Sequence, residues 1–215
     1  MIGTNHLSTL KFIMDIAHFN DSFPFIVIKN LYDDYELNLI WEELNFLCYS
    51  HKFLDLNESA PARNSDDKIL KRNNSLFLDS TYTERKLSNI LSVNRKIFDY
   101  YDEIFPTSDS WFFNTFRCER DTTLISYYEN GDYYEPHQDN AISTCLTWFF
   151  KSPKKFHGGN LSLIHKGRKI DIEVENNKCI IFPSNILHSV DKITMNDEDL
   201  NKKLGRFCIT QFLIN

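Results

Sequence analysis

With 215 residues, 42% of them hydrophobic, the chain can build one well-buried core but is short for two, so we expect a single domain over residues 1–215. The net charge of -6 gives no general attraction to phosphate backbones, which argues against a nucleic-acid partner. No apolar run approaches the roughly 18 to 20 residues of a membrane span, and the first 20 residues lack a signal-peptide segment, so we expect a cytoplasmic protein without a membrane partner.

The cysteines point to core thiols in a reducing compartment. They are odd in number and include no Cys-x-x-Cys pair, which argues against a disulfide framework or a zinc ribbon. The five are Cys48, Cys118, Cys145, Cys179 and Cys208.

The N-terminal half combines strand and helix patterns. Phe25–Asn30 is apolar enough for a short strand, and Asp33–Ser50 repeats apolar residues at helical spacing. Residues 55–68 are polar and aperiodic, which predicts a long loop that is either a functional lid or disordered. Ile69–Asp79 then has the pattern of a strand.

A second helix is predicted before Pro106. Thr81 and Glu84 have the spacing of a capping box, and an apolar stripe continues from Leu87 to Ile104. Residues 1–109 are therefore expected to form helical and strand support for the C-terminal half of the chain.

From residue 110 to residue 215 the pattern changes to short strands separated by polar turns. This pattern is typical of a sandwich or barrel rather than a parallel sheet, so the predicted class is mainly β with helical support, an α+β protein. The predicted strands are Trp111–Arg117, Thr122–Glu129, Ile142–Phe150, Asn160–His165, Lys169–Val174, Lys178–Phe182, His188–Thr194 and Phe207–Ile214.

A candidate metal site lies within these strands. His137 and Asp139 are two residues apart, and side chains at that spacing on a strand share one face with Cα atoms about 6 to 7 Å apart. His188 follows Asp139 by 49 residues and would complete the set from a later strand. Two histidines and a carboxylate suit a non-heme Fe(II) with open positions, although Zn, Mn, Co or Ni would also bind them.

Arg206 is a candidate for binding an organic acid. It opens an apolar strand on which Thr210 shares its face, and a guanidinium can bind a carboxylate through two hydrogen bonds. An ion pair with a carboxylate at the edge of the core is the structural alternative. Because 18 residues separate His188 from Arg206, Lys202 or Lys203 could serve instead.

The motifs around these residues resemble a known family. Within Ile125–Asp139, the positions of Tyr128, Gly131, Tyr134 and Pro136 relative to His137 resemble the metal-binding strand of 2-oxoglutarate-dependent, Fe(II)-dependent oxygenases, in particular the prolyl 4-hydroxylase-like group. Further blocks follow in the same order as in that group, and the resemblance covers about residues 120–215. These blocks are Gly158–Leu161, Phe182–Ser184, Leu187–Val190 and Gly205–Thr210.

The resemblance implies a double-stranded β-helix, or jelly roll, with helices packed on one outer face. It implies Fe(II), 2-oxoglutarate and O2, with ascorbate as a further candidate cofactor. It also implies roles for individual residues. The metal ligands and catalytic residues would be His137, Asp139 and His188, the 2-oxoglutarate-binding residues would be Arg206, Thr210 and Tyr128, and Tyr133 and Tyr134 are candidates for touching the substrate.

Several functions stay open. Hydroxylation is favoured over halogenation, because related halogenases lack the carboxylate that Asp139 supplies. The resemblance to prolyl 4-hydroxylases makes a peptide or protein side chain the leading substrate, with proline as the first candidate. A hydroxylase of a free amino acid or small metabolite is the first alternative. A nucleic-acid demethylase is the second, although such enzymes carry a second arginine shortly after the first, and Arg206 is followed by none. A non-catalytic metal-binding sensor is the third, and the oligomeric state is left open.

Overall fold

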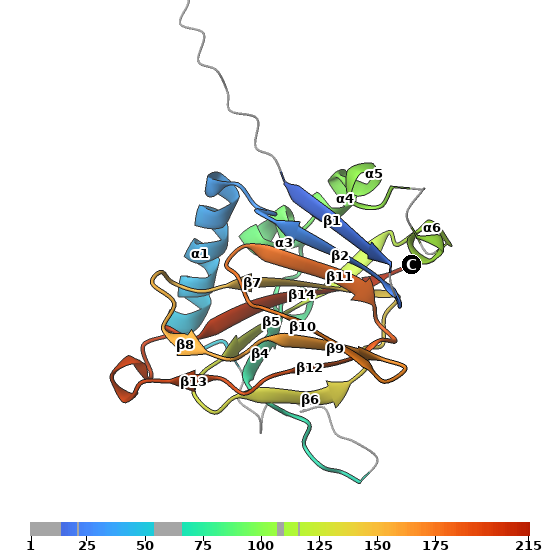
Figure 1. Ribbon diagram of the computed structural model, residues 1–215. Coiled ribbons are helices and arrows are strands. Elements are labelled where there is room, and N and C mark those ends of the chain that lie inside the picture. The colour runs from blue at the N-terminus through green and yellow to red at the C-terminus, as the bar shows by residue number, and fades with distance from the viewer. Residues whose placement is uncertain (1–13, 21, 54–65, 107–109, 116) are drawn as a thin grey trace, which may run out of the picture.

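Two antiparallel sheets face each other in the computed structural model, which describes residues 14–20, 22–53, 66–106, 110–115 and 117–215 (Figure 1). Most of the predicted loop at 55–68 lies outside these residues. The larger sheet has the order β1-β2-β11-β7-β14-β5-β4, and the smaller has the order β10-β9-β12-β6-β3. The larger sheet contains β1 (Asp15–Asn20), β2 (Pro24–Lys29), β4 (Asn74–Phe77), β5 (Arg120–Tyr128), β7 (Ser143–Phe149), β11 (Lys178–Pro183) and β14 (Arg206–Ile214).

The smaller sheet covers one face of the larger one. It contains β3 (Lys71–Arg72), β6 (Tyr133–His137), β9 (Leu161–His165), β10 (Arg168–Ile172) and β12 (Leu187–Val190). A separate pair is formed by β8 (Phe156–His157) and β13 (Thr194–Met195), and a 3-10 turn, η2 (Asp197–Asp199), comes after β13. This arrangement is the jelly roll that the sequence predicted, and the predicted class, mainly β with helical support, is confirmed.

The larger sheet is buried on both faces, and this creates two separate cores. On β14, Phe207 and Ile209 belong to the core on the helix side, whereas Cys208 belongs to the core between the sheets. Successive side chains of a strand point to opposite faces, so one strand serves both cores. The space between the sheets is where a site can form.

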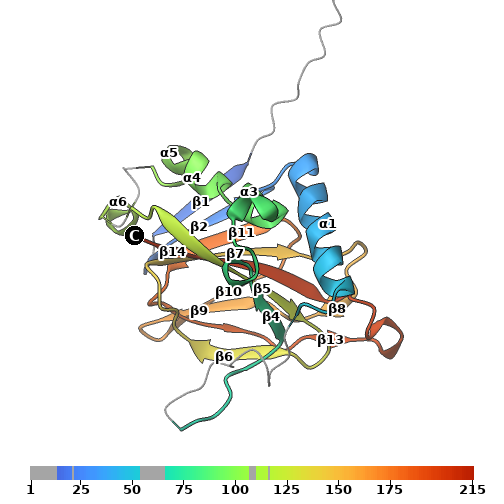
Figure 2. The same ribbon diagram turned by 180° about the vertical axis from the view of Figure 1, so that it is seen from behind.

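Helices pack on the outer face of the larger sheet (Figure 2). The longest is α1 (Asp34–Tyr49), which begins at a complete capping box between Asp33 and Glu36 and buries Ile40, Leu44 and Leu47 against the sheet. The short ones are α2 (Leu78–Thr81), η1 (Arg85–Leu87), α3 (Asn89–Val93), α4 (Lys96–Asp99), α5 (Tyr101–Ile104) and α6 (Trp111–Thr115). No helix among the described residues is long and apolar enough to cross a membrane.

The prediction of one continuous second helix from Thr81 was wrong, because this region is divided into short helical turns. The cap that forms is Ser88, whose side chain accepts from the Leu91 backbone N–H at 3.0 Å. Glu43 on α1 fixes this cap, since its carboxylate accepts from Ser88 Oγ at 2.8 Å and from the Ile90 backbone N–H at 2.7 Å. A tertiary contact thus decides where the helix starts.

The predicted strand at Trp111–Arg117 was also wrong, because Trp111–Thr115 is the helix α6. Ser110 starts it by accepting from the Phe112 backbone N–H at 3.2 Å. Phe112 and Phe113 are both buried, and two adjacent buried aromatic residues occur in helices as well as in strands. The prediction was wrong because it relied on the preference of aromatic residues for strands.

Most of the remaining predicted strands differ from the structure only at their ends, whereas β1, β8 and β13 were not predicted. β12 stops at Val190 rather than Thr194, because the Asp191 N–H bonds to the Asn160 carbonyl outside the sheet. The predicted strand Ile69–Asp79 is divided into β3 and β4 and ends in α2. The N-terminal half therefore contributes β1 to β4 to both sheets, beyond supporting them from outside.

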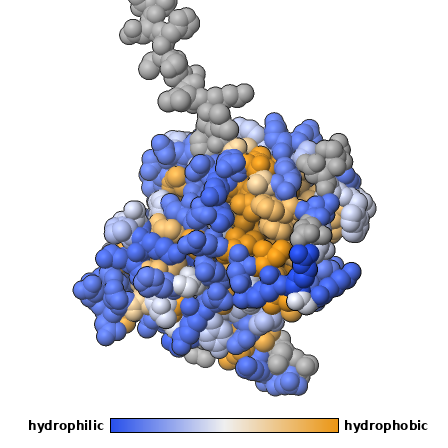
Figure 3. All heavy atoms as spheres, viewed as in Figure 1, coloured by the Kyte–Doolittle hydropathy of each residue, from blue (hydrophilic) through white to orange (hydrophobic). Residues whose placement is uncertain are grey.

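One apolar area stays uncovered on the side of β1 and β2, as the spheres in Figure 3 show. Phe19 on β1 is 44% exposed and stacks on Phe25 of β2 with ring centroids 4.6 Å apart. The seven-stranded sheet is wider than the five-stranded one, so part of its inner face has no opposing strand.

Removing the charge of Glu43 should weaken the link between α1 and α3. Glu43→Gln keeps the size of the side chain but loses a charged acceptor for Ser88 and Ile90, so we expect the free energy of unfolding to fall by about 1.5 to 3 kcal/mol. Denaturant unfolding measures this. Glu42→Gln on the exposed side of α1 is the matched control, and an equal effect of the two variants would contradict the assignment.

Candidate metal centre

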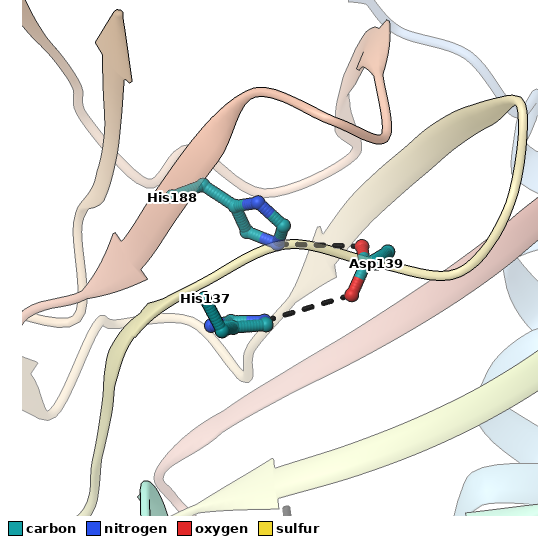
Figure 4. A group of neighbouring side chains, drawn as sticks. All are labelled: His137, Asp139 and His188. Carbon is teal, nitrogen blue, oxygen red and sulfur yellow. Dashed lines mark ion pairs between the residues drawn. The ribbon is translucent and has the colours of Figure 1, made fainter. Parts of the chain in front are cut away.

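Three potential metal ligands converge at one end of the space between the sheets. His137 ends β6 and pairs in register with His188 on β12. Asp139 reaches both histidines, with its carboxylate oxygens 3.6 Å from His137 Nε2 and 3.3 Å from His188 Nε2 (Figure 4). All three donor atoms lie within 4.8 Å of one another.

Asp139 reaches this position from a loop, and not from a strand as the sequence argument assumed. β6 ends at His137, and the Asp139 backbone N–H bonds to the Ser184 carbonyl at 3.0 Å. The exposed Gln138 bonds to the Asn185 carbonyl, so the side chain between the two ligands points away as predicted. The loop backbone is thus anchored to the segment that leads into β12.

Backbone carbonyls orient both imidazole rings. His137 Nδ1 lies 2.9 Å from the Glu135 carbonyl, and His188 Nδ1 lies 2.9 Å from the Ile186 carbonyl. A carbonyl only accepts, so each Nδ1 carries a proton and each Nε2 presents a lone pair toward Asp139. Burial, together with the neighbouring His188, lowers the pKa of His137 to about 4, which keeps its ring neutral and able to bind a metal.

The Asp139 carboxylate is held in its charged form. Burial alone would raise its pKa, but the contact with His188 and the hydrogen bond from Thr144 outweigh burial and lower the pKa below its ordinary value. Thr144 Oγ1 donates to Asp139 Oδ2 at 2.7 Å and is itself 2.8 Å from Ser184 Oγ. Since the single hydroxyl proton of Thr144 goes to Asp139, Ser184 donates to Thr144.

This donor set fits a divalent metal ion. Ligands about 2.1 Å from a metal in neighbouring octahedral positions lie about 3 Å apart, close to the separations in the triad. Two neutral imidazoles and one carboxylate leave the other positions open. The chemistry of these donors suits Fe(II).

A cavity of about 60 Å³ extends from the triad between the two sheets. Apolar side chains supply much of its wall, which lowers the local dielectric constant and strengthens electrostatic contacts inside it. The lining residues are Lys71, Leu124, Ser126, Tyr128, Tyr134, His137, Asp139, Leu146, Trp148, Leu161, His188, Val190, Arg206, Cys208, Thr210 and Phe212.

Arg206 faces this cavity from β14 and is only 1% exposed. Its guanidinium lies over the Tyr128 ring at 4.2 Å and donates to the Gly159 carbonyl, while its Nε is buried without a partner. No carboxylate in the described part of the chain forms an ion pair with Arg206, so the structural alternative of a core-edge salt bridge has no support there. The arrangement leaves a buried cation with spare donors, which fits a carboxylate of 2-oxoglutarate.

The other predicted co-substrate residues also line the cavity. Thr210 shares the inner face of β14 with Arg206, and Tyr128 lies opposite Arg206 on β5. Burial raises the pKa of Tyr128 to about 12, so the phenol stays neutral and can donate a hydrogen bond. The lysine alternatives lie elsewhere, since Lys202 is exposed and Lys203 Nζ lies 4.6 Å from the Tyr127 ring, outside the cavity lining.

The two candidate substrate tyrosines are separated by the structure. Tyr134 lines the cavity and stacks on His137, with ring centroids 3.5 Å apart. Tyr133 is its neighbour on β6 and does not line the cavity, because adjacent strand residues point to opposite faces.

Two residues at the site were missed by the sequence analysis. Thr144 sits in an unbroken buried strand, where a threonine gives no sign that its hydroxyl reaches Asp139. Lys71 lies in a two-residue strand, and only the pairing of that strand with β6 brings it to the cavity. A buried lysine is unusual, but its burial is not visible in the sequence.

Comparisons with known proteins agree with this geometry. Residues 123–214, which contain the triad, Arg206 and Thr210, match the model of the 2OG-Fe(II) oxygenase superfamily. No curated protein sequence matches the chain. The match confirms the family resemblance predicted from the motifs.

Solved structures share the fold at low sequence identity. A Pseudomonas putida prolyl-4-hydroxylase matches with a TM-score of 0.58 and 12% identity, over 90% of this chain and 94% of that chain. A Trichoplax adhaerens prolyl hydroxylase, in complex with a hypoxia inducible factor oxygen degradation domain peptide fragment, matches with a TM-score of 0.61 and 14% identity, over 88% of this chain and 83% of that one. A structure of prolyl 4-hydroxylases from Phytophthora capsici matches with a TM-score of 0.57 and 15% identity, over 89% of this chain and 58% of that chain.

Loss of the Thr144 hydroxyl should weaken metal binding. Thr144→Val keeps the shape of the side chain but removes the hydrogen bond to Asp139, and losing such an outer partner of a ligand costs about 10- to 100-fold in metal affinity. Anaerobic Fe(II) titration measures this.

The control is Thr147→Val on the same strand, where the buried threonine pairs with Cys179 and Ile209 on the helix side of the sheet. An unchanged Fe(II) affinity in Thr144→Val, or an equal loss in both variants, would contradict the role given to Thr144.

Proposed function

Because residues 123–214 match the model of the 2OG-Fe(II) oxygenase superfamily, we propose that the protein hydroxylates an unactivated C–H bond in a peptide or protein side chain, with proline as the first candidate. One observation carries the proposal most directly. A cavity holds a two-histidine, one-carboxylate triad and, in the same lining, a buried arginine with an unpartnered Nε. A buried guanidinium with free donors beside a metal site fits an organic acid that is held next to the metal.

The metal would be held by His137 Nε2, His188 Nε2 and one oxygen of Asp139. With Fe(II) and 2-oxoglutarate bound, such a centre couples oxidation of 2-oxoglutarate by O2 to the insertion of oxygen into a C–H bond. The protein's part is to hold the ligands in place. The Glu135 and Ile186 carbonyls fix the two rings, and Thr144 fixes the carboxylate.

Arg206 would bind the distal carboxylate of 2-oxoglutarate. Its Nε and the donors not used by Gly159 are free for two parallel hydrogen bonds, and the Tyr128 ring holds the guanidinium plane in position. Thr210 would add a hydroxyl donor from the same face of β14, and Tyr128 would donate from its neutral phenol.

The apolar wall would exclude water from the reacting atoms. Leu146, Trp148 and Leu161 come from both sheets and line the cavity beside the polar groups. A dry site strengthens the contacts of the 2-oxoglutarate carboxylates with Arg206 and the metal, and it protects reactive species from side reactions.

The choice of a peptide substrate is supported by the structural relatives. The Pseudomonas putida and Trichoplax adhaerens proteins are prolyl hydroxylases, and the second was solved with a peptide fragment. At 12% and 14% identity these likenesses establish the fold, so the substrate of this chain is part of the proposal.

A cytoplasmic location belongs to the same proposal. The cysteines are five in number, which cannot all be paired within one chain, and four of them are buried as core thiols. Such usage suits a reducing compartment.

The cofactor pair can be tested with spectroscopy. Anaerobic addition of Fe(II) and then 2-oxoglutarate should give the weak visible charge-transfer band of the chelate, and His137→Ala should abolish it because a ligand is lost. Arg206→Met should keep the band but raise the apparent Kd for 2-oxoglutarate by about 100-fold, since a buried charge pair contributes several kcal/mol.

Arg168→Met, at an exposed position, is the matched arginine control and should bind 2-oxoglutarate like the wild type. Absence of the band in folded wild-type protein would sink the proposed function. Normal 2-oxoglutarate affinity in Arg206→Met would refute the role of Arg206.

A further inference from the structure

Lys71 is a buried cation that faces the metal cavity. It lies on β3 directly opposite Tyr134 of β6, is 7% exposed, and lines the same cavity as the triad and Arg206. Its ammonium lies 5.8 Å from the centroid of the Tyr134 ring. Across the residues that the structure describes, no carboxylate forms an ion pair with it.

This arrangement is costly for the ligand-free protein. Lysine is almost never fully buried unless it is paired, because removing an ammonium from water costs several kcal/mol. Burial lowers the pKa of Lys71, and in the part of the chain that the structure describes no acidic group offsets this effect. An anion that arrives with a ligand would supply the missing partner.

The position of Lys71 places that anion close to the metal. The ring of Tyr134 contacts both groups, since the ammonium lies 5.8 Å from its centroid and the His137 ring stacks on it with centroids 3.5 Å apart. The ammonium and the metal ligand His137 therefore share Tyr134 as a neighbour. A small substrate could therefore place a carboxylate beside Lys71 while its reacting carbon faces the metal.

A count of the charges in the cavity indicates whether the metal and 2-oxoglutarate already supply this anion. A divalent metal, Arg206 and Lys71 bring four positive charges, while Asp139 and the two carboxylates of 2-oxoglutarate bring three negative charges. The neutral His137 adds none. One positive charge is left over when the metal and the co-substrate are bound.

We propose that Lys71 binds a carboxylate of the primary substrate. This rests on the proposed function and narrows its substrate class to compounds with a carboxylate near the hydroxylated carbon. The carboxylate comes either from the α-carboxylate of a free or C-terminal amino acid, or from an Asp or Glu side chain beside the target residue. Both sources offer the same partner to the ammonium.

Ligand binding to the loaded but inactive site tests this. Protein loaded with Mn(II) and 2-oxoglutarate broadens the NMR lines of protons that bind near the metal. The probes are the N-acetylated amino acids with a free carboxylate, and the same compounds as primary amides. The amides of N-acetyl-Asp and N-acetyl-Glu carry only a side-chain carboxylate and so separate the two sources.

We expect the wild type to broaden at least one carboxylate-bearing probe at a concentration where its neutral counterpart is unaffected. Lys71→Met should weaken this binding at least 10-fold, Lys71→Arg should keep most of it, and Lys169→Met at an exposed position should leave it unchanged. Equal binding of charged and neutral probes, or broadening of none of them, would overturn the proposal.

A 2-oxoglutarate titration tests whether Lys71 binds a carboxylate of the co-substrate instead of one of the primary substrate. We expect Lys71→Met to bind 2-oxoglutarate within about 2-fold of the wild type, in contrast to Arg206→Met. A 10-fold or larger loss would show that Lys71 holds the co-substrate and would overturn the proposal. Failure of the proposed function is a different result, because the charge-transfer band would then be absent from the wild type.

Thermal unfolding shows whether Lys71→Met impairs folding. Because Lys71→Met removes a buried charge that has no ion-pair partner among the described residues and keeps an apolar stem, we expect the ligand-free variant to melt about 2 to 4 °C higher than the wild type. A lower melting temperature would show that the ammonium has a structural partner and would overturn the proposal.

Discussion

The alternation of side chains along β14 is the constraint on which the site depends. Phe207 and Ile209 are held in the core under the helices, and this fixes Arg206 and Thr210 on the opposite face, toward the cavity. A slip of one residue would exchange the two sets and would bury the guanidinium among apolar side chains. Hydrophobic packing against α1 therefore determines that Arg206 faces the cavity.

The metal ligands are fixed in a different way, through short contacts to the backbone. Each histidine uses the carbonyl two residues before it, Glu135 for His137 and Ile186 for His188, so ring orientation is set locally once β6 and β12 pair. The loop that carries Asp139 is anchored to Ser184, which also donates to Thr144. The donor geometry is therefore built into the fold before any metal binds, as effective metal sites require.

The sequence was informative where spacing along the chain determines the structure. Most β-strands of the C-terminal half, helix α1 and the triad residues were predicted from local periodicity and motif spacing, whereas the two-residue strands β8 and β13 were not. The sequence was uninformative where a contact with a residue far away in the chain determines where a helix begins or ends. Glu43 on α1 divides the second helix through Ser88, 45 residues away, and no local pattern reports that contact. Aromatic residues likewise gave α6 the appearance of a strand, because Phe112 and Phe113 are apolar under either structure.

Two buried cations, Arg206 and Lys71, give the cavity its character. Neither has a carboxylate partner among the described residues, and a protein optimised for stability alone would pair such charges or replace them with apolar groups. Any ligand that binds only the folded state and brings its own carboxylates recovers part of that cost as apparent stability. The two cations reach the cavity from different sheets, Arg206 from the larger and Lys71 from the smaller. A single dianion that engages the metal and Arg206 leaves Lys71 unsatisfied, and the cavity is electrostatically complete only when the substrate also carries a negative charge.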